Sequence, residues 1–184
     1  MPETTTQSRS DTRPRPISPS MSAIGPRDFG YDHARHLLWR AAFGGTPEQV
    51  RAMAEMGPRD AVDYLLDFKA SHDLDPGPQA GDLNNGIMRP LTQAEQQQYR
   101  DARRRQDEET LARFRRERQN RQRNDRQQMR ELQKGWLARL IQSPRPLEEK
   151  LTLFWHGHFA TSYRGVENSY HMFMQNQLFR TNAA

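Results

Sequence analysis

The sequence predicts an all-α protein. Apolar residues recur at intervals of three and four over several segments, which is the spacing that places them on one face of a helix. No segment shows the alternation of apolar and polar residues that is typical of a strand. The ends of the periodic segments carry capping boxes, N-terminal prolines and terminal glycines. We therefore expect short helices in two packed lobes, with a long, charged, solvated helix inserted between them.

The N-terminal part of the chain divides into a tail and a lobe. Residues 1–28 are rich in Thr, Ser, Pro and Arg and are expected to form a disordered tail. Residues 29–69 are expected to form an N-terminal lobe of three short helices, separated by turns at Gly44-Gly45 and Gly57-Pro58. Thr46 has the capping-box sequence for the second helix, with Gln three residues later.

A linker and a highly charged segment follow. Residues 70–91 contain Pro-Gly and Asn-Gly turn signals and are expected to be a loop or linker. Residues 92–135 are expected to form one extended helix, which begins at the capping box of Thr92. Every fourth residue from 101 to 125 alternates in charge sign, and each such pair stabilises a helix by about 0.2–0.5 kcal/mol. The alternative for this segment is a disordered insertion rich in Arg and Gln.

The charged segment also holds the basic excess of the protein. Thirteen basic and eight acidic residues lie between Glu95 and Lys134, which accounts for the whole net charge of +5. A solvated spacer of coiled-coil type is favoured over a nucleic-acid site, because the interleaved acids repel phosphate and only Tyr99 and Phe114 are available for base stacking. The candidate interaction residues are Arg103, Arg104, Arg115, Arg116 and Arg123.

Residues 136–184 are expected to form the second lobe. A break at Ser143–Pro146 separates two of its helices, and a last helix is expected from about Tyr163. The stretch Phe154–Phe159 reads Phe-Trp-His-Gly-His-Phe and concentrates aromatic and imidazole side chains in six residues. The residues expected to have a structural role are Trp155, Phe154, Phe43 and Gly44.

The two histidines of this motif are the candidates for metal binding or acid–base catalysis. His156 and His158 would point about 200° apart on a helix, so they converge only if the helix unwinds at Gly157. A third ligand for zinc, iron or copper would then come from Glu167 or His171. The alternative is structural: His158 lies buried in the core, and His156 caps a helix or lines the surface.

Composition excludes several classes of protein. Only 34% of the 184 residues are hydrophobic, and the mean hydropathy of -1.07 is too low for a single compact core throughout. No window approaches the roughly 20 apolar residues of a membrane span. The lack of cysteine excludes disulfides, thiolate metal sites and cysteine nucleophiles. Since neither a signal peptide nor a membrane span is seen, the default compartment is the cytoplasm, and secretion stays open.

Three stretches resemble a known family. They are His36–Pro47 (HLLWRAAFGGTP), Arg145–Thr161 (RPLEEKLTLFWHGHFAT) and Gln175–Arg180 (QNQLFR). The sequence resembles the start of the large bacterial family catalogued as domain of unknown function number 1800. The resemblance implies a mostly helical bacterial protein with no established activity. It also implies that the chain is the N-terminal portion of a longer domain, which continues past Arg180 through a second acidic and asparagine-rich motif.

These observations predict a protein-interaction or structural module without a complete catalytic set. Its expected partner is another protein or the missing C-terminal half of the same domain, with no membrane partner and with nucleic acid disfavoured. One alternative is the half-site of a metal-dependent enzyme centred on His156 and His158, and a second is nucleic-acid binding through the Arg-rich helix. No cofactor is indicated beyond a divalent metal at these histidines.

Overall fold

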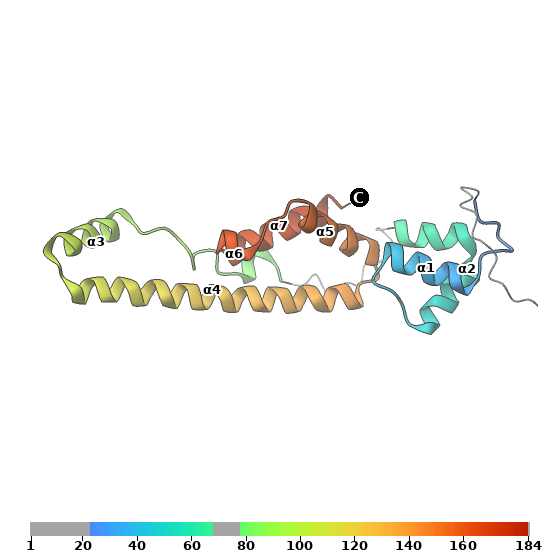
Figure 1. The fold of residues 1–184 in the computed structure, drawn as a ribbon, viewed down its shortest axis with the longest axis horizontal. Coiled ribbons are helices and arrows are strands. Elements are labelled where there is room, and N and C mark those ends of the chain that lie inside the picture. The colour runs from blue at the N-terminus through green and yellow to red at the C-terminus, as the bar shows by residue number, and fades with distance from the viewer. Residues whose placement is uncertain (1–22, 68–77, 184) are drawn as a thin grey trace, which may run out of the picture.

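A computed structural model describes residues 23–67 and 78–183, and all of its regular elements are helices, which confirms the all-α class (Figure 1). A lobe of two helices lies at one end of an elongated molecule, and one long helix runs from near this lobe to the opposite end. The elements are α1 (Tyr31–Ala41), α2 (Pro47–Leu66), the 3₁₀ turn η1 (Ala80–Asp82), α3 (Gln93–Arg105), α4 (Glu108–Gln142), α5 (Pro146–His158), α6 (Tyr163–Val166) and α7 (Ser169–Thr181).

The turn signals of the N-terminal lobe act as expected at two positions. Gly44 adopts a positive φ of 94° after α1, a conformation that favours glycine. The Thr46 hydroxyl accepts from the Gln49 N–H at 3.3 Å, and the Gln49 side chain accepts from the Thr46 N–H at 2.8 Å. The expected break between the second and third helices is also present: Gly57 takes a non-helical conformation (φ 79°, ψ 171°), and the two helical segments of α2 meet there at a kink.

The core of this lobe is apolar, and α1 and α2 supply all of it. Its buried residues are Ala34, Leu38, Ala42, Val50, Met53, Ala61 and Leu65. Phe43, which was expected to have a structural role, is 43% exposed. It contacts the second lobe instead, since the Lys150 ammonium lies 5.6 Å from the centre of its ring and donates to the carbonyl oxygens of Trp39 (2.6 Å) and Ala42 (2.5 Å).

The expected single helix over residues 92–135 is wrong in two respects. The chain breaks at Gln106, which adopts a left-handed conformation (φ 54°), and Asp107 then caps α4 by accepting from the Thr110 N–H at 3.0 Å. α3 therefore folds back along α4, and Tyr99 packs edge-on against Phe114 at 5.5 Å. At its other end α4 passes through the expected boundary at residue 135 and ends only at Gln142.

The charge ladder forms only in part. Arg113 and Glu117 pair at 4.0 Å as the spacing predicts. Arg121 lies 3.9 Å from Glu95 of α3 instead of extending the ladder along α4. Asp125 is buried, so this portion of α4 is packed rather than solvated.

Asp125 holds α4 against the C-terminal helices. Its Oδ1 accepts from the Ser169 N–H (2.9 Å) and hydroxyl (2.6 Å), and its Oδ2 accepts from the Tyr163 hydroxyl at 2.7 Å. Burial, followed by this bond and the charge of Asp125, raises the pKa of Tyr163 to about 12. Gln128 adds a bond to the Ser169 hydroxyl at 3.0 Å, so one face of α4 carries a polar docking site.

The break at Ser143–Pro146 is present, as predicted. The helix before it is the end of α4, so the C-terminal lobe begins with α5 and not at residue 136 as expected. The last expected helix is divided into α6 and α7, because Glu167 takes a left-handed conformation (φ 47°) and Asn168 caps α7 by accepting from the His171 N–H at 3.0 Å. Within the part of the chain that the structure describes, no helix is long and apolar enough to cross a membrane. Of the tail predicted over 1–28 and the linker predicted over 70–91, residues 1–22 and 70–77 lie outside the described residues, and the described part of the linker contains η1.

Candidate functional site

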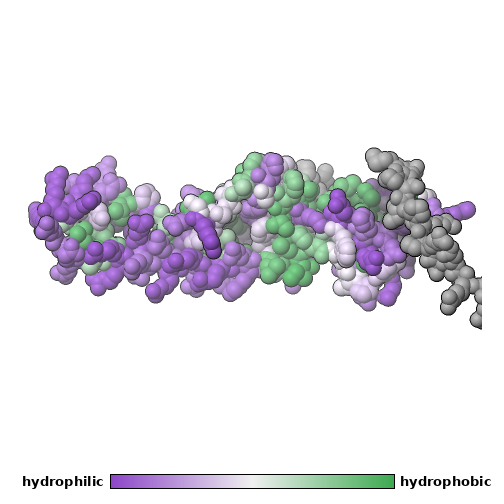
Figure 2. Space-filling view, in the orientation of Figure 1, coloured by the Kyte–Doolittle hydropathy of each residue, from purple (hydrophilic) through white to green (hydrophobic). Residues whose placement is uncertain are grey.

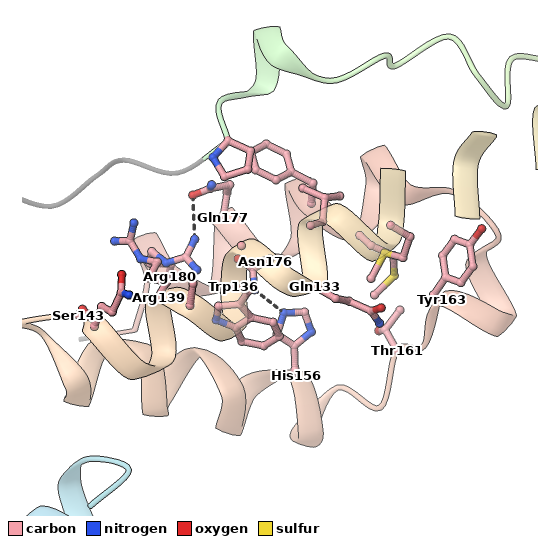
Figure 3. Close-up of a pocket in the computed structure, with 18 of the residues that line it drawn as sticks. Gln133, Trp136, Arg139, Ser143, His156, Thr161, Tyr163, Asn176, Gln177 and Arg180 are labelled. Carbon is pink, nitrogen blue, oxygen red and sulfur yellow. Dashed lines mark hydrogen bonds between the residues drawn. The ribbon is translucent and has the colours of Figure 1, made fainter. Parts of the chain in front are cut away.

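A cavity of about 600 Å³ lies between α4 and α7, beside the C-terminal end of α5 (Figure 3). Its volume falls within the range of small-molecule sites. Its larger apolar side chains are Met129, Leu132, Trp136, Met172 and Phe173. Polar side chains gather along the same walls, and they include Gln133, Arg139, Ser143, His156, Thr161, Tyr163, Asn176, Gln177 and Arg180.

The carboxylate of Glu149 is fully buried behind one end of this cavity. Its Oε1 accepts from Arg139 Nε and, at 2.9 Å, from Arg180 Nε. Its Oε2 accepts from Trp136 Nε1 at 3.0 Å and from Arg180 Nη2 at 3.1 Å. Burial raises the pKa of Glu149, but the hydrogen bonds and charges of the two guanidinium groups outweigh it and lower the pKa. Glu149 thus fixes both arginines and the indole of Trp136.

The neighbouring carboxylate, Glu148, is in a different environment. Arg139 and Arg145 approach it only to 4.0 Å, and its Oε2 is buried without a hydrogen-bond partner. Burial therefore raises its pKa, with Arg145 opposing the shift and the charge of Glu149 adding to it. Three guanidinium groups, those of Arg139, Arg145 and Arg180, therefore lie near these two carboxylates.

His156 lies half-buried in the middle of the cavity wall. Its Nε2 is 3.1 Å from Asn176 Nδ2, and its ring lies 4.9 Å from those of Trp136 and Phe179. Burial, followed by the charge of Arg180, lowers the pKa of His156 below its usual value of 6.5. The imidazole is therefore neutral at neutral pH, and its Nε2 accepts the hydrogen bond from Asn176.

The four residues proposed as metal ligands do not come together. α5 stays helical through Gly157, so His156 faces the cavity while His158 is exposed and stacks on Phe154 at 6.0 Å. His171 and Glu167 are exposed elsewhere. Among residues 23–67 and 78–183, no three His, Asp or Glu side chains are grouped as a metal would need.

The structural alternative assigned the two histidines the wrong way round. The buried face of α5 follows Glu149, Thr152 and His156, at intervals of three and four, so His156 is the packed histidine. His158 lies off this line and is exposed. Of the aromatic residues given a structural role, Trp155 is half-buried, whereas Phe154 is 56% exposed.

A second feature lies on the face of α4 that points away from the other helices. Seven exposed residues succeed one another at intervals of three, four or seven, which places them on one line: Arg116, Arg123, Arg126, Arg130, Lys134, Leu137 and Ile141. We call this line the α4 stripe. Figure 2 shows the hydrophilic surface along α4 and a hydrophobic patch towards its C-terminal end.

The α4 stripe carries a single sign of charge. The acidic residues within 116–141 are Glu117, Asp125 and Glu131, and none of them falls on this line. Glu131 lies beside it and pairs with Lys134 at 2.9 Å. Of the arginines proposed for interaction, Arg116 and Arg123 belong to the stripe. The other three lie off it: Arg115 pairs with Glu108 at 3.0 Å, while Arg103 and Arg104 are exposed on α3.

Residues 36–184 match the family described as "Protein of unknown function (DUF1800)". The chain belongs to this family. The match confirms the resemblance drawn from the motifs, and it includes the cavity and the α4 stripe. No curated protein and no solved structure matches the chain.

In this DUF1800 member, sequence reasoning located the site region but missed most of its residues. The Phe-Trp-His-Gly-His-Phe motif pointed to His156, whereas Glu149, Arg180 and Asn176 were not singled out. One signal was available for Glu149: it precedes His156 by seven residues, on the same face of α5. The partners on α7 are distant in sequence, with 31 residues between Glu149 and Arg180 and 20 between His156 and Asn176, and no local pattern indicates them.

Proposed function

We propose that this DUF1800 member is a helical protein-interaction module, and that the α4 stripe binds an acidic, amphipathic helix of a partner protein. The observation that carries the proposal is the composition of the stripe: four exposed arginines and Lys134, which pairs with Glu131, are followed by two highly exposed apolar side chains. A complementary partner presents carboxylates opposite the cations and apolar residues opposite Leu137 and Ile141.

The positive charge of the stripe is the reason why we propose an acidic partner. The line from Arg116 to Lys134 extends over about 27 Å of helix, at 1.5 Å per residue. Exposed like charges in a row repel one another and attract an oppositely charged surface, which speeds and orients association. An acidic helix lying alongside α4 places carboxylates at the same spacing as these cations.

The apolar end of the stripe favours a protein over a nucleic acid. Leu137 is 58% exposed and Ile141 is 76% exposed, one turn apart on the same face. Phosphate groups satisfy cations but do not cover exposed leucine and isoleucine, whereas the buried centre of a protein interface does.

The test uses a synthetic leucine-zipper helix with Glu at its e and g positions. A matched peptide carries Lys at those positions, and a duplex DNA of mixed sequence is the third probe. We expect the acidic peptide to bind the full chain at least about tenfold more tightly than the lysine peptide, measured by fluorescence anisotropy in about 0.1 M salt.

Charge reversal then locates the surface. The double variant Arg123→Glu/Arg130→Glu is expected to abolish the preference for the acidic peptide, and Leu137→Ser/Ile141→Ser is expected to weaken its binding. The control Arg51→Glu/Arg59→Glu makes the same change of charge on exposed positions of α2 and should bind like the wild type. Equal affinity for both peptides, or DNA that binds more tightly and is lost in the α4 variants, would overturn the proposal.

A further inference from the structure

We infer that the cavity between α4 and α7 binds a small amphipathic carboxylate, with its head group at Arg180 and its apolar body along Trp136 and Met172. This inference does not rest on the proposed function. The cavity is lined by the face of α4 that holds Trp136 and Arg139, whereas the stripe is formed by the opposite face, through Lys134 and Leu137.

The head group is indicated by the guanidinium groups at one end of the cavity. Figure 3 shows Arg139 and Arg180 side by side there, next to Ser143 and Gln177. Arg180 donates through Nε and Nη2 to Glu149 and through Nη1 to Gln177 at 3.2 Å. A guanidinium has five N–H donors, so two remain for a ligand after these three bonds. A carboxylate is the planar acceptor that fits such a fork.

Glu149 acts as a positioning residue for this head group. Because its carboxylate is fully buried and bonded to Arg139, Arg180 and Trp136, it holds the guanidinium of Arg180 in place without itself lining the cavity. A pre-oriented arginine loses less conformational entropy on binding than a free one. The buried carboxylate of Glu149 therefore serves to orient Arg180 for the head group of the ligand.

The body of the ligand is indicated by the middle of the cavity. Trp136, Leu132 and Phe173 offer flat and branched apolar surface, and Met172 adapts to irregular shapes. The polar side chains of Thr161 and Tyr163 lie at the end away from the arginines (Figure 3). The arrangement fits an elongated molecule with one acidic end, such as a medium-chain carboxylate.

The experiment compares three ligands of equal chain length by isothermal titration calorimetry on the full chain, each below its aggregation concentration. The ligands are decanoate, decanol and decylammonium. We expect decanoate to bind at one site per chain, about tenfold more tightly than decanol, because only the carboxylate makes charge-assisted hydrogen bonds. Decylammonium should bind more weakly than decanol.

Two variants assign the binding to this cavity. Gln133→Trp places a large ring in the cavity from an exposed position, and its control is Gln119→Trp, an exposed position of the same helix that does not line the cavity. We expect the first to lose decanoate binding by about tenfold or more and the second to bind like the wild type. The double variant Arg180→Gln/Glu149→Gln removes one charge of each sign and should bind decanoate no better than decanol.

Several results of these experiments would contradict the proposed binding of a carboxylate. Equal affinity for decanoate and decanol, no binding of decanoate, several sites per chain, or unchanged binding in Gln133→Trp would each overturn the inference. If circular dichroism shows that the double variant does not fold, the comparison of Gln133→Trp with Gln119→Trp still decides. Loss of decanoate binding in Gln133→Trp with the acidic peptide still bound by the α4 stripe would separate this site from the proposed function.

Discussion

The N-terminal lobe buries apolar side chains, whereas the C-terminal lobe places charged and hydroxyl side chains at its most buried positions. The buried residues shared by α1 and α2 are all apolar, as Met53 and Leu65 illustrate. In α5 and α7 the residues with no exposed surface are Glu149, Thr152 and Ser169. Both lobes are helical and belong to one chain, so the difference in their buried residues comes from their sequences.

This difference separates a region that serves stability from one that is organised around polar groups. Apolar burial stabilises a fold without directional requirements. Burial of a carboxylate costs several kcal/mol, which is recovered only if its bonds are complete, and an apolar replacement is often at least as stable. The pairs that Glu149 makes with Arg139 and Arg180 are therefore weak evidence for stability alone. They are better explained by the orientation of the two arginines at the cavity.

The largest expected effect on stability is the loss of the Glu149 charge. In Glu149→Gln the guanidinium groups of Arg139 and Arg180 lose the buried carboxylate that they share, which costs about 3–5 kcal/mol. Urea unfolding followed by circular dichroism measures this change. The matched control is Glu148→Gln, for which we expect a change within about 1 kcal/mol, because Glu148 accepts no close hydrogen bond at its buried oxygen. Equal effects of the two variants would contradict the assigned network.

A smaller effect is expected from the apolar core of the other lobe. Leu65→Ala removes a side chain that is 3% exposed and leaves a cavity among its neighbours, at a cost of about 3 kcal/mol. The adjacent Leu66 is 56% exposed, so Leu66→Ala should change the free energy of unfolding by less than about 0.5 kcal/mol. If the lobes differ as described, Leu65→Ala also leaves binding at the cavity unchanged in the folded protein, which calorimetry with decanoate would show.

Capping boxes and a terminal glycine predicted several helix ends correctly. The capping boxes at Thr46 and Thr92 form as expected, and Gly44 ends α1 in the conformation that glycine favours. The break at Gln106 was not predicted because no glycine or proline marks it, although Asp107, followed by two glutamates, has the sequence of a helix start. Its reason is tertiary: α3 gains the contact between Tyr99 and Phe114 only by folding back on α4.

The candidate site shows the same limit of local information. The motif around His156 drew attention to the helix that borders the cavity, but the rotation of α5 about its axis decides which histidine is packed. That rotation depends on the bonds from Glu149 to Arg139 and Arg180, which are 10 and 31 residues away in sequence. Periodicity along α5 could have placed Glu149 and His156 on one face, but not their partners on other helices.

The smallest expected effect concerns pH and belongs to the cavity lobe. The pKa of His156 is lowered in the folded protein, so the fold favours the neutral imidazole. Its contribution to stability is present above the usual histidine pKa of 6.5 and is lost as the pH falls from there through the folded-state pKa. We therefore expect the free energy of unfolding to decrease between pH 7.5 and pH 5.5, and His156→Gln to reduce this decrease. Glutamine keeps an acceptor for Asn176 but does not titrate, so the change isolates the protonation of one ring.

The control for this effect is His158→Gln, because His158 is exposed on the other side of α5. That variant should keep the full pH dependence of the wild type. The lowered pKa of Glu149 does not interfere, since its contribution is lost only below the usual carboxyl range, near pH 4.5 and lower. If both histidine variants lost the same part of the pH dependence, the packed position of His156 would not be its source, and the contrast between the two lobes would no longer extend to their response to acid.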